Sequence, residues 1–357
     1  MMKKIDTLME QAIARGVFPG STLLIADSSS IAYHKSYGTI QEGDETVVTS
    51  DTVFDLASLT KPLVTAPAIM QLIRNKAISL DTRVADLFDQ FAGASKKDIT
   101  IADLLAHISG LPAHSPYYKK LRDVPEEKRM ALLQSMVLSE PLETVRGETV
   151  VYSDLGFMIL GWVIEKLSGQ PLSEFSAENI FNLLDINTLF FPADKTASRQ
   201  DIVYSATEKC PWRKKTLLGE VHDDNAWIAG GILGHAGLFG TAKGVFQLLR
   251  EYLDVYTGKR KSPVFDVGLL KVFLSEYKNI RRTFGFDMPS VKDSSSGDFF
   301  SKRSVGHLGF TGTSFWMDPD NGIIIILLTN RVNPSRDNIK IRKFRPEIHN
   351  LIVQLMK

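Results

Sequence analysis

The first part of the chain carries a helical pattern followed by two strand patterns. Apolar residues recur at helical spacing over 5–15, with polar residues between them. Segments 21–26 and 31–37 then follow as two strand-like runs, joined by the serine-rich loop 28–30. We therefore predict an N-terminal helix that leads into a β-hairpin. The apolar face of the helix comprises Ile5, Leu8, Met9, Ala12 and Ile13.

The last quarter of the chain has the reverse order, a hairpin followed by a helix. Residues 313–317 alternate in character, and 323–329 form a continuous apolar run that is typical of a buried strand. The residues between them, 318–322, are Asp-Pro-Asp-Asn-Gly, which favours a tight turn. An amphipathic pattern over 347–356 predicts a closing helix.

The middle of the chain is mainly helical in pattern. Segments 125–139, 154–167 and 245–256 each carry apolar residues at helical spacing. The segment 154–167 has the strongest boundaries, because Ser153 can cap its start and Gly169 can end it.

Together these patterns predict an α/β (α+β) fold. One antiparallel sheet, built from both termini, would be flanked by the N- and C-terminal helices, and a mainly helical domain would be inserted into it. We predict a sheet domain of residues 1–57 and 284–357 and a helical domain of residues 58–283. A functional site is expected at the seam between the two domains, where binding sites often lie.

Composition and charge exclude several classes of function. The chain has 357 residues, of which 44% are hydrophobic and 23% charged, as in an ordinary soluble enzyme. Its net charge of +1 does not favour nucleic acid or an anionic membrane surface as a partner. The single cysteine, Cys210, excludes an intrachain disulfide framework and C-x-x-C metal sites.

The sequence also bears on the location of the protein. The apolar run 323–328 is too short to span a bilayer, so we expect no membrane segment. Segment 5–15 carries charges and lacks the apolar core of a secretory signal. We expect a cytoplasmic protein, whereas a leader that had been removed would instead allow the periplasm or export. The sequence does not indicate an oligomeric state.

The stretch Ser58-Leu-Thr-Lys61 places a serine and a lysine one helical turn apart. A serine hydroxyl becomes a good nucleophile when a neighbouring base takes its proton. Lysine is such a base only if its pKa falls, which a helix N-terminus favours. Alternatively, Ser58 caps the helix and Lys61 is a solvated residue of its first turn. The S-x-x-K pattern is too short to decide between these interpretations.

Two further segments carry candidate chemistry. Tyr152 precedes the helix over 154–167, and the pKa of its phenol would fall near a lysine, which would make it a general base. The alternative is a tyrosine that anchors the start of this helix. The glycine-rich run His307-Leu-Gly309-Phe-Thr-Gly312 would let a substrate approach a backbone N–H closely. The alternative there is a turn with a solvated histidine.

In this order, the segments resemble the serine β-lactamase and penicillin-binding-protein superfamily. The resemblance is greatest to its class C branch, which includes class C β-lactamases, family VIII carboxylesterases and D-aminopeptidase-like enzymes. It extends over residues 5–356, and segment 104–112 matches the Leu-Leu-x-His-x-Ser-Gly-Leu-Pro of that branch. The three main motifs are S-x-x-K at Ser58 and Lys61, Tyr-x-Asn at Tyr152 to Asp154, and Lys/His-Thr-Gly at His307 to Gly309.

The resemblance implies a two-step acyl transfer. Ser58 would attack a carbonyl, with Lys61 and Tyr152 sharing the role of base. The N–H groups of Ser58 and Phe310 would hold the oxyanion, and water would then release the acyl-enzyme. The implied substrate is a small ester, amide or peptide, and neither a cofactor nor a metal ion is implied.

Two departures from the family motifs bear on the substrate. Asp154 stands where Asn is usual; an ionised Asp cannot donate a hydrogen bond to a substrate carbonyl, and it would raise the pKa of Lys61. His307-Leu308, beside Gly309, replaces Lys-Thr, although His307 would become charged at mildly acidic pH. These four residues are expected to contact the substrate. We therefore expect esterase or peptidase activity, including activity on D-amino-acid peptides, and weak or absent β-lactamase activity.

Two other interpretations remain open. The same departures would suit a catalytically inactive protein that binds peptide or cell-wall fragments, which predicts that Lys61 lies beyond reach of Ser58. The run His222-Asp-Asp-Asn225, together with His235, could be read as a metal cluster, but the spacing matches no strong metal motif. We expect these residues to have a structural or substrate-cleft role.

Overall fold

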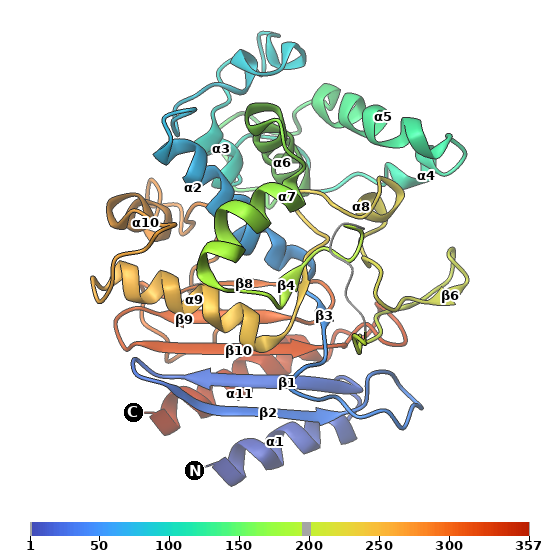
Figure 1. Cartoon of the computed structure of the whole chain (residues 1–357), viewed down its shortest axis with the longest axis vertical. Coiled ribbons are helices and arrows are strands. Elements are labelled where there is room, and N and C mark those ends of the chain that lie inside the picture. The colour runs from blue at the N-terminus through green and yellow to red at the C-terminus, as the bar shows by residue number, and fades with distance from the viewer. Residues whose placement is uncertain (1, 195–200, 357) are drawn as a thin grey trace.

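The computed structural model describes residues 2–194 and 201–356. Its largest element is a five-stranded antiparallel sheet in the order β2-β1-β10-β9-β8 (Figure 1). As predicted, its strands come from both ends of the chain. The central pair joins β1 to β10, with Ser21 opposite Thr329 and Ala26 opposite Ile324. The five strands are β1 (Gly20–Ala26), β2 (Ile31–Gly38), β8 (Val305–Leu308), β9 (Ser314–Asp318) and β10 (Ile323–Thr329).

The two faces of the sheet belong to separate hydrophobic clusters. Side chains alternate along a strand, so Leu23 and Ile25 pack with α1 (Met2–Ala14) and α11 (Ile341–Met356), while Leu24 faces the inserted helices. Every residue of β10 is buried, which explains its nearly continuous apolar sequence. Each large apolar side chain buried in this way contributes about 2 kcal/mol to stability. The terminal helices therefore flank the sheet as predicted.

Helix α6 (Asp154–Ser168) lies at the centre of the helical region (Figure 1). Its residues 155–164 are all buried, so this helix is apolar on every side. The side chain of Ser153 accepts a hydrogen bond from the Gly156 N–H at its start, and Gly169, with φ of 72°, ends it. Both boundaries agree with the sequence prediction. The start of this helix lies near the sheet, because the Tyr152 ring is 5.8 Å from the ring of His307 on β8.

The remaining elements surround α6 and cover one face of the large sheet. Helix α9 (Ala242–Tyr256) packs directly on β10 and β1. The other helices are α2 (Ala66–Arg74), α3 (Ile101–Leu105), α4 (Tyr118–Leu121), α5 (Glu126–Ser139), α7 (Leu172–Ser176), α8 (Asp224–Ile228) and α10 (Val267–Leu274). The minor strands are β3 (Phe54–Asp55), β7 (Phe239–Gly240) and β4 (Leu189–Phe190), which form one small sheet, and β5 (Lys209–Cys210) and β6 (Lys215–Thr216), which form another.

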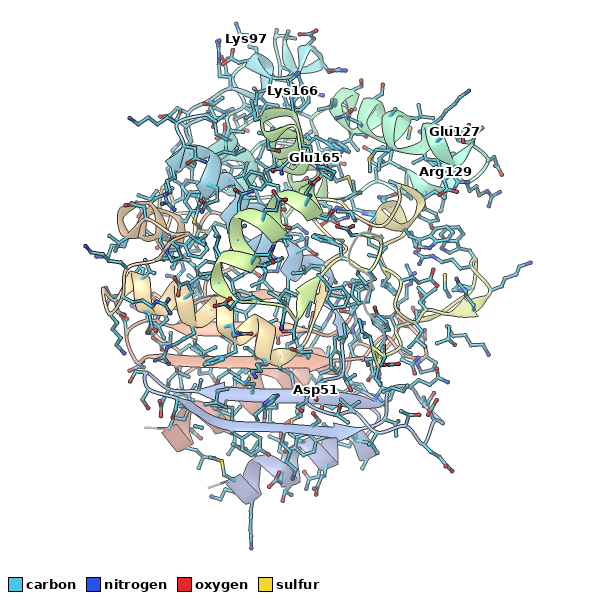
Figure 2. The ribbon with its side chains drawn as sticks, viewed as in Figure 1. Asp51, Lys97, Glu127, Arg129, Glu165 and Lys166 are labelled. Carbon is cyan, nitrogen blue, oxygen red and sulfur yellow. The ribbon has the colours of Figure 1, made fainter. Side chains whose placement is uncertain are left out.

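The surface of the helical region is charged. Figure 2 shows Lys97 and Glu127 at its outer edge, and both side chains are exposed. Within residues 2–194 and 201–356, no helix is both long and apolar enough to cross a membrane.

Candidate active site

Ser58 lies directly after strand β3, in a 3-10 turn of residues Ala57–Leu59. The preceding Ala57 has φ of 48°, a left-handed conformation that costs an alanine about 1–2 kcal/mol. Its N–H donates to Asp55 Oδ1 at 2.8 Å, which helps to hold this conformation. A π-helical turn, Lys61–Thr65, then leads into α2. The strained backbone therefore presents Ser58 at the start of a helical segment.

Lys61 is in hydrogen-bonding contact with Ser58. Its Nζ lies 3.0 Å from Ser58 Oγ, and its side chain is fully buried. The same Nζ lies 2.7 Å from Asp154 Oδ1 and 3.4 Å from the carbonyl oxygen of His235. The structure thus brings the serine, the lysine and Asp154 together, although Asp154 is distant from them in the sequence.

Asp154 controls the charge of this group. Burial disfavours the Lys61 ammonium, but the Asp154 carboxylate, together with Tyr152, outweighs burial and raises the pKa of Lys61. For Asp154, burial disfavours the charged carboxylate and acts to raise its pKa. The nearby Lys61 cation acts in the opposite direction and prevails, so the pKa of Asp154 is lowered. The raised pKa of Lys61 was expected from the Asp154 departure. It is the opposite of what a helix N-terminus alone would produce.

His114 is a member of this group that the sequence did not indicate. Its Nδ1 lies 3.7 Å from Asp154 Oδ2, and the proximity of the Asp154 carboxylate raises the pKa of His114. The two oxygens of Asp154 therefore face Lys61 and His114 separately. His114 stands in an irregular loop, where neither spacing nor a motif marks it.

Tyr152 packs beside Lys61 in the loop before α6. The Lys61 Nζ lies 4.8 Å from the centroid of its ring, and the His107 and His307 rings lie 4.6 Å and 5.8 Å away. Burial raises the pKa of Tyr152, against the opposing effect of the neighbouring Lys61 cation. The pKa of Tyr152 was expected to fall near a lysine; Lys61 does act in that direction, but desolvation is the larger influence and the net shift is upward.

His107 holds the loop on both sides of Tyr152. Its carbonyl accepts from the Val151 N–H at 2.9 Å, and its Nδ1 accepts from the Ser153 N–H at 3.0 Å. An accepting Nδ1 leaves the proton of the neutral ring on Nε2. Burial lowers the pKa of His107 well below its usual value, so the ring is neutral. The sequence showed His107 only as part of a helix end.

Strand β8 supplies the opposite side of the site. His307 is buried, and burial lowers its pKa to about 4. The expectation that it becomes charged at mildly acidic pH was therefore wrong. Leu308 is half-buried, and Gly309 approaches the Ser58 segment so closely that a Cβ would lie 2.7 Å from the Leu56 carbonyl oxygen. The cation at this side is Arg282, which the sequence did not indicate; it lies 5.7 Å from the Tyr152 ring.

The turn 309–313, between β8 and β9, is tied to the Ser58 segment. Thr311 Oγ1 donates to the Asp55 carbonyl at 2.7 Å, and Thr313 Oγ1 donates to the Leu56 carbonyl at 3.1 Å. Within the described part of the chain, neither the Ser58 N–H nor the Phe310 N–H has a hydrogen-bond partner. Both donors are therefore available for an oxyanion.

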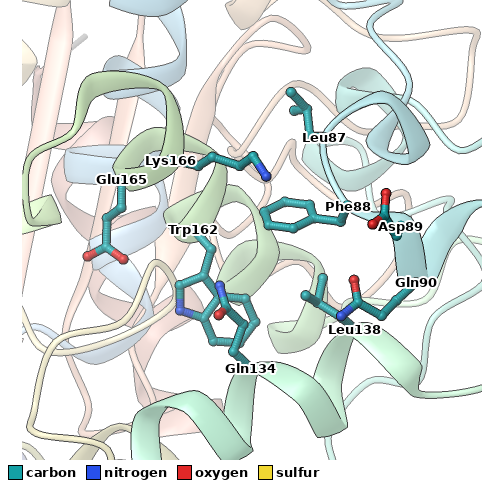
Figure 3. Close-up of a pocket in the computed structure, with 9 residues that line it drawn as sticks. All are labelled: Leu87, Phe88, Asp89, Gln90, Gln134, Leu138, Trp162, Glu165 and Lys166. Atoms are coloured by element: carbon teal, nitrogen blue, oxygen red, sulfur yellow. The ribbon is translucent and has the colours of Figure 1, made fainter.

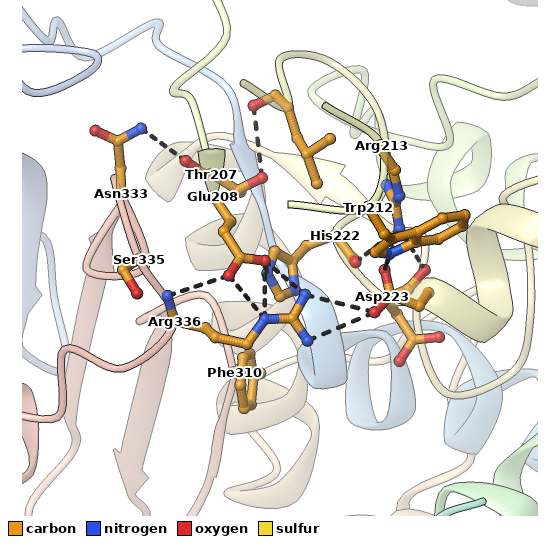
Figure 4. Close-up of polar contacts among 12 residues, drawn as sticks. Thr207, Glu208, Trp212, Arg213, His222, Asp223, Phe310, Asn333, Ser335 and Arg336 are labelled. Atoms are coloured by element: carbon orange, nitrogen blue, oxygen red, sulfur yellow. Dashed lines mark hydrogen bonds and ion pairs between the residues drawn. The ribbon is translucent and has the colours of Figure 1, made fainter. Parts of the chain in front are cut away.

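A polar network next to Phe310 joins three segments of the chain (Figure 4). Glu208 pairs with Arg336 and lies 3.3 Å from His222 Nε2, while Arg336 also reaches Asp224. The His222 ring stacks on the Phe310 ring at 5.4 Å. His222 therefore lies beside Phe310, within a network of charged side chains. Among the described residues, no group of three or more His, Cys, Asp or Glu side chains is placed to hold a metal ion.

A separate surface pocket of about 520 Å³ lies beside the C-terminal half of α6 (Figure 3). Its lining includes Phe88, Trp162 and Lys166. Glu165 also lines this pocket, and at the rise per residue of an α-helix it lies about 16 Å along α6 from Asp154. None of the predicted site residues lines this pocket, so it is distinct from the candidate active site.

Replacing Asp154 by asparagine is expected to move the acid limb of the pH profile of kcat/KM to lower pH. Lys61 accepts a proton only when it is neutral, and the change removes the carboxylate that raises its pKa. Hydrolysis of a p-nitrophenyl ester by both proteins, from acidic to alkaline pH, measures the limb. The Glu127→Gln variant, at an exposed carboxylate, should keep the original profile. A limb that stays in place or moves to higher pH in Asp154→Asn would contradict the role of Asp154.

Comparison with known proteins identifies a family. The family model described as Beta-lactamase matches residues 5–349. A protein of Escherichia coli (strain K12) named "Putative D-alanyl-D-alanine carboxypeptidase" is 31% identical, over 92% of this chain and 82% of that protein. An N-acetylmuramyl-L-alanine amidase of Bacillus subtilis (strain 168) is 30% identical, over 92% of this chain and 81% of that protein.

Solved structures share the fold at lower identity. An octameric penicillin-binding protein homologue from Pyrococcus abyssi matches with a TM-score of 0.76 and 20% identity, over 100% of this chain and 78% of that chain. EstCE1, described as a hydrolase with promiscuous acyltransferase activity, matches with a TM-score of 0.72 and 20% identity, over 97% and 98% of the two chains.

Proposed function

This chain belongs to the β-lactamase family of hydrolases, and from that premise we propose that it cleaves a small ester or amide through an acyl-enzyme on Ser58. One observation carries the proposal: the fully buried Lys61 Nζ lies 3.0 Å from Ser58 Oγ. That is hydrogen-bonding distance between a nucleophile and its base. The Tyr152 ring, 4.8 Å from the same Nζ, completes the group.

The proposed reaction has two steps. Ser58 Oγ attacks the carbonyl carbon, and its proton passes to Lys61 and Tyr152, which titrate as one coupled unit. The N–H groups of Ser58 and Phe310 receive the oxyanion. The bond to the leaving group then breaks, and that group takes the proton. In the second step water attacks the acyl-enzyme, gives a proton to the same unit and releases the acid, while Ser58 recovers its proton.

The site favours an ester or peptide-type amide over a β-lactam. Ionised Asp154 accepts hydrogen bonds but cannot donate one, Leu308 has no hydroxyl, and His307 is neutral near neutral pH. The relatives in Escherichia coli and Bacillus subtilis carry the names of an alanine carboxypeptidase and a muramyl-alanine amidase. We therefore place the substrate among small amides or esters of the cell-wall peptide type.

A second candidate, a non-catalytic binder of peptide or cell-wall fragments, has one observation in its favour. The Lys61–Asp154 pair, at 2.7 Å, raises the pKa of the lysine, keeps it protonated and so reduces the fraction that is neutral and able to accept a proton. A binder also predicts that Lys61 is out of reach of Ser58, and the 3.0 Å separation speaks against this. The hydrolase is therefore the better supported function.

Covalent labelling distinguishes the two candidates. A fluorophosphonate probe is expected to attach once per chain, and peptide mapping should place the adduct on Ser58. A panel of p-nitrophenyl esters, D-alanyl peptides and nitrocefin should then show turnover of the esters or peptides and weak turnover of nitrocefin. A protein that takes no label and turns over none of the panel, even at alkaline pH, would favour the non-catalytic binder.

A further inference from the structure

Two buried arginines lie behind the turn 309–313. Arg331 is 8% exposed and Arg345 is 6% exposed. Within the described part of the chain, neither guanidinium forms an ion pair with a carboxylate, whereas Arg336 and Arg213 nearby both do. Burying a cation without a counter-charge is costly, so buried arginines are normally paired. The cost of burying these two arginines indicates that they serve the function of the protein at this turn.

Arg331 fixes Phe310 through both its backbone and its ring. Its Nη2 donates to the Phe310 carbonyl, and its guanidinium carbon lies 4.7 Å from the centroid of the Phe310 ring. Its Nη1 is held in turn by the carbonyls of Arg336 at 2.9 Å and Asn338 at 2.7 Å. Because His222 stacks on the Phe310 ring as well, this residue has little freedom to rotate.

Arg345 acts on the other end of the turn. Its Nη2 donates to the Thr313 carbonyl at 2.9 Å, and the same carbonyl accepts the Gly309 N–H at 2.8 Å. The hydrogen bond that closes the turn is therefore shared with a cation from α11. Gly312, with φ of 114°, packs so tightly that a Cβ would lie 2.5 Å from Arg331 Cγ. The arginines thus support the turn from behind while Thr311 and Thr313 tie it to the Ser58 segment.

We propose that Arg331 and Arg345 are positioning residues for acyl transfer, which hold the Phe310 N–H toward the oxyanion and place unpaired positive charge behind it. This inference rests on the proposed function of Ser58 and Phe310. Burial lowers the pKa of Arg345 to about 9 and of Arg331 to about 10, so both remain cationic at neutral pH. Negative charge develops on the substrate oxygen only in the transition state, so the two cations should affect kcat more than KM.

Substitution of each arginine by methionine tests the inference. Arg331→Met and Arg345→Met are each expected to lower kcat for a p-nitrophenyl ester by about 100-fold, the effect of losing an oxyanion donor, with little change in KM. An arylboronic acid forms a tetrahedral anion on Ser58, so its affinity for each variant should fall by about the same factor as kcat. Lys343→Met, at an exposed cation of the helix that carries Arg345, is the matched control and should change neither quantity.

The readouts separate positioning from a purely structural role. Rates are to be expressed per active site titrated with fluorophosphonate, so that loss of folded protein does not count as loss of kcat. Correctly folded methionine variants with unchanged kcat and unchanged boronic acid affinity would overturn the inference. Turnover that survives Ser58→Ala would instead overturn the proposed function itself.

The lysine variants keep the test decisive if the methionine variants do not fold. Lysine retains the charge but has one nitrogen, which cannot reproduce the divergent hydrogen bonds of the guanidinium. Arg331→Lys and Arg345→Lys are therefore expected to lose about tenfold in kcat at unchanged KM. Where the lysine and the methionine variant of one arginine both fold, the lysine variant should have the higher kcat. Lysine variants with the full original kcat would contradict the positioning role.

Discussion

Ser58→Ala is expected to lower kcat/KM for a p-nitrophenyl ester by at least about 10⁴-fold, because it removes the atom that forms the acyl-enzyme. The fold should be largely unaffected, since Ser58 is only half-buried and the change removes a single oxygen atom, which accepts from Lys61 Nζ at 3.0 Å. Initial rates and thermal unfolding of the same preparation measure the two effects. Ser95→Ala, at an exposed serine, should keep both the rate and the melting temperature. A folded Ser58→Ala protein with substantial turnover would show that another group is the nucleophile.

Lys61→Met should lower kcat/KM by about 10³-fold and also destabilise the protein by about 3 kcal/mol. The first effect follows from loss of the base next to Ser58. The second arises because Asp154, whose side chain is 18% exposed, loses the cation 2.7 Å away. Denaturant unfolding and ester hydrolysis measure the two effects on one variant.

The double variant Lys61→Met/Asp154→Asn separates these effects. Removing both charges leaves no buried carboxylate without a partner, so most of the lost stability should return while the activity stays low. If the double variant instead regained activity, Lys61 would have served mainly to neutralise Asp154. If Lys61→Met alone kept its full stability, the pairing of Lys61 with Asp154 would contribute little to the stability of the protein.

The sequence predicted the parts of the fold and site that depend on local patterns. Alternation and helical spacing are short-range properties, so the two hairpins and the terminal helices could be located, and their shared sheet followed from packing rules. Ser58 and Lys61 are one turn apart, so their contact was also local. The position of Tyr152 was available only through the family motif. The division into sheet and helical domains stays a prediction.

The charge states could not be predicted, because they depend on burial and on long-range neighbours. Asp154 is 93 positions from Lys61, yet its carboxylate determines the direction in which the lysine pKa moves. His307 was expected to become charged at mildly acidic pH and the pKa of Tyr152 was expected to fall, but burial lowers the pKa of His307, and desolvation raises that of the half-buried Tyr152. Arg331 and Arg345 were missed for the same reason, since arginine is usually exposed and no pattern marks a buried one.

The pairing of β1 with β10 has a consequence for the order in which the protein is made. Ser58 leaves the ribosome about 250 residues before Phe310, and the strand β10, which pairs with β1, follows later still. Contacts between such distant segments form late, and an apolar strand edge without its neighbour is prone to aggregate. A nascent chain therefore carries its serine and lysine long before it can use them. Premature termination would yield an inactive, aggregation-prone fragment and not a partly active enzyme.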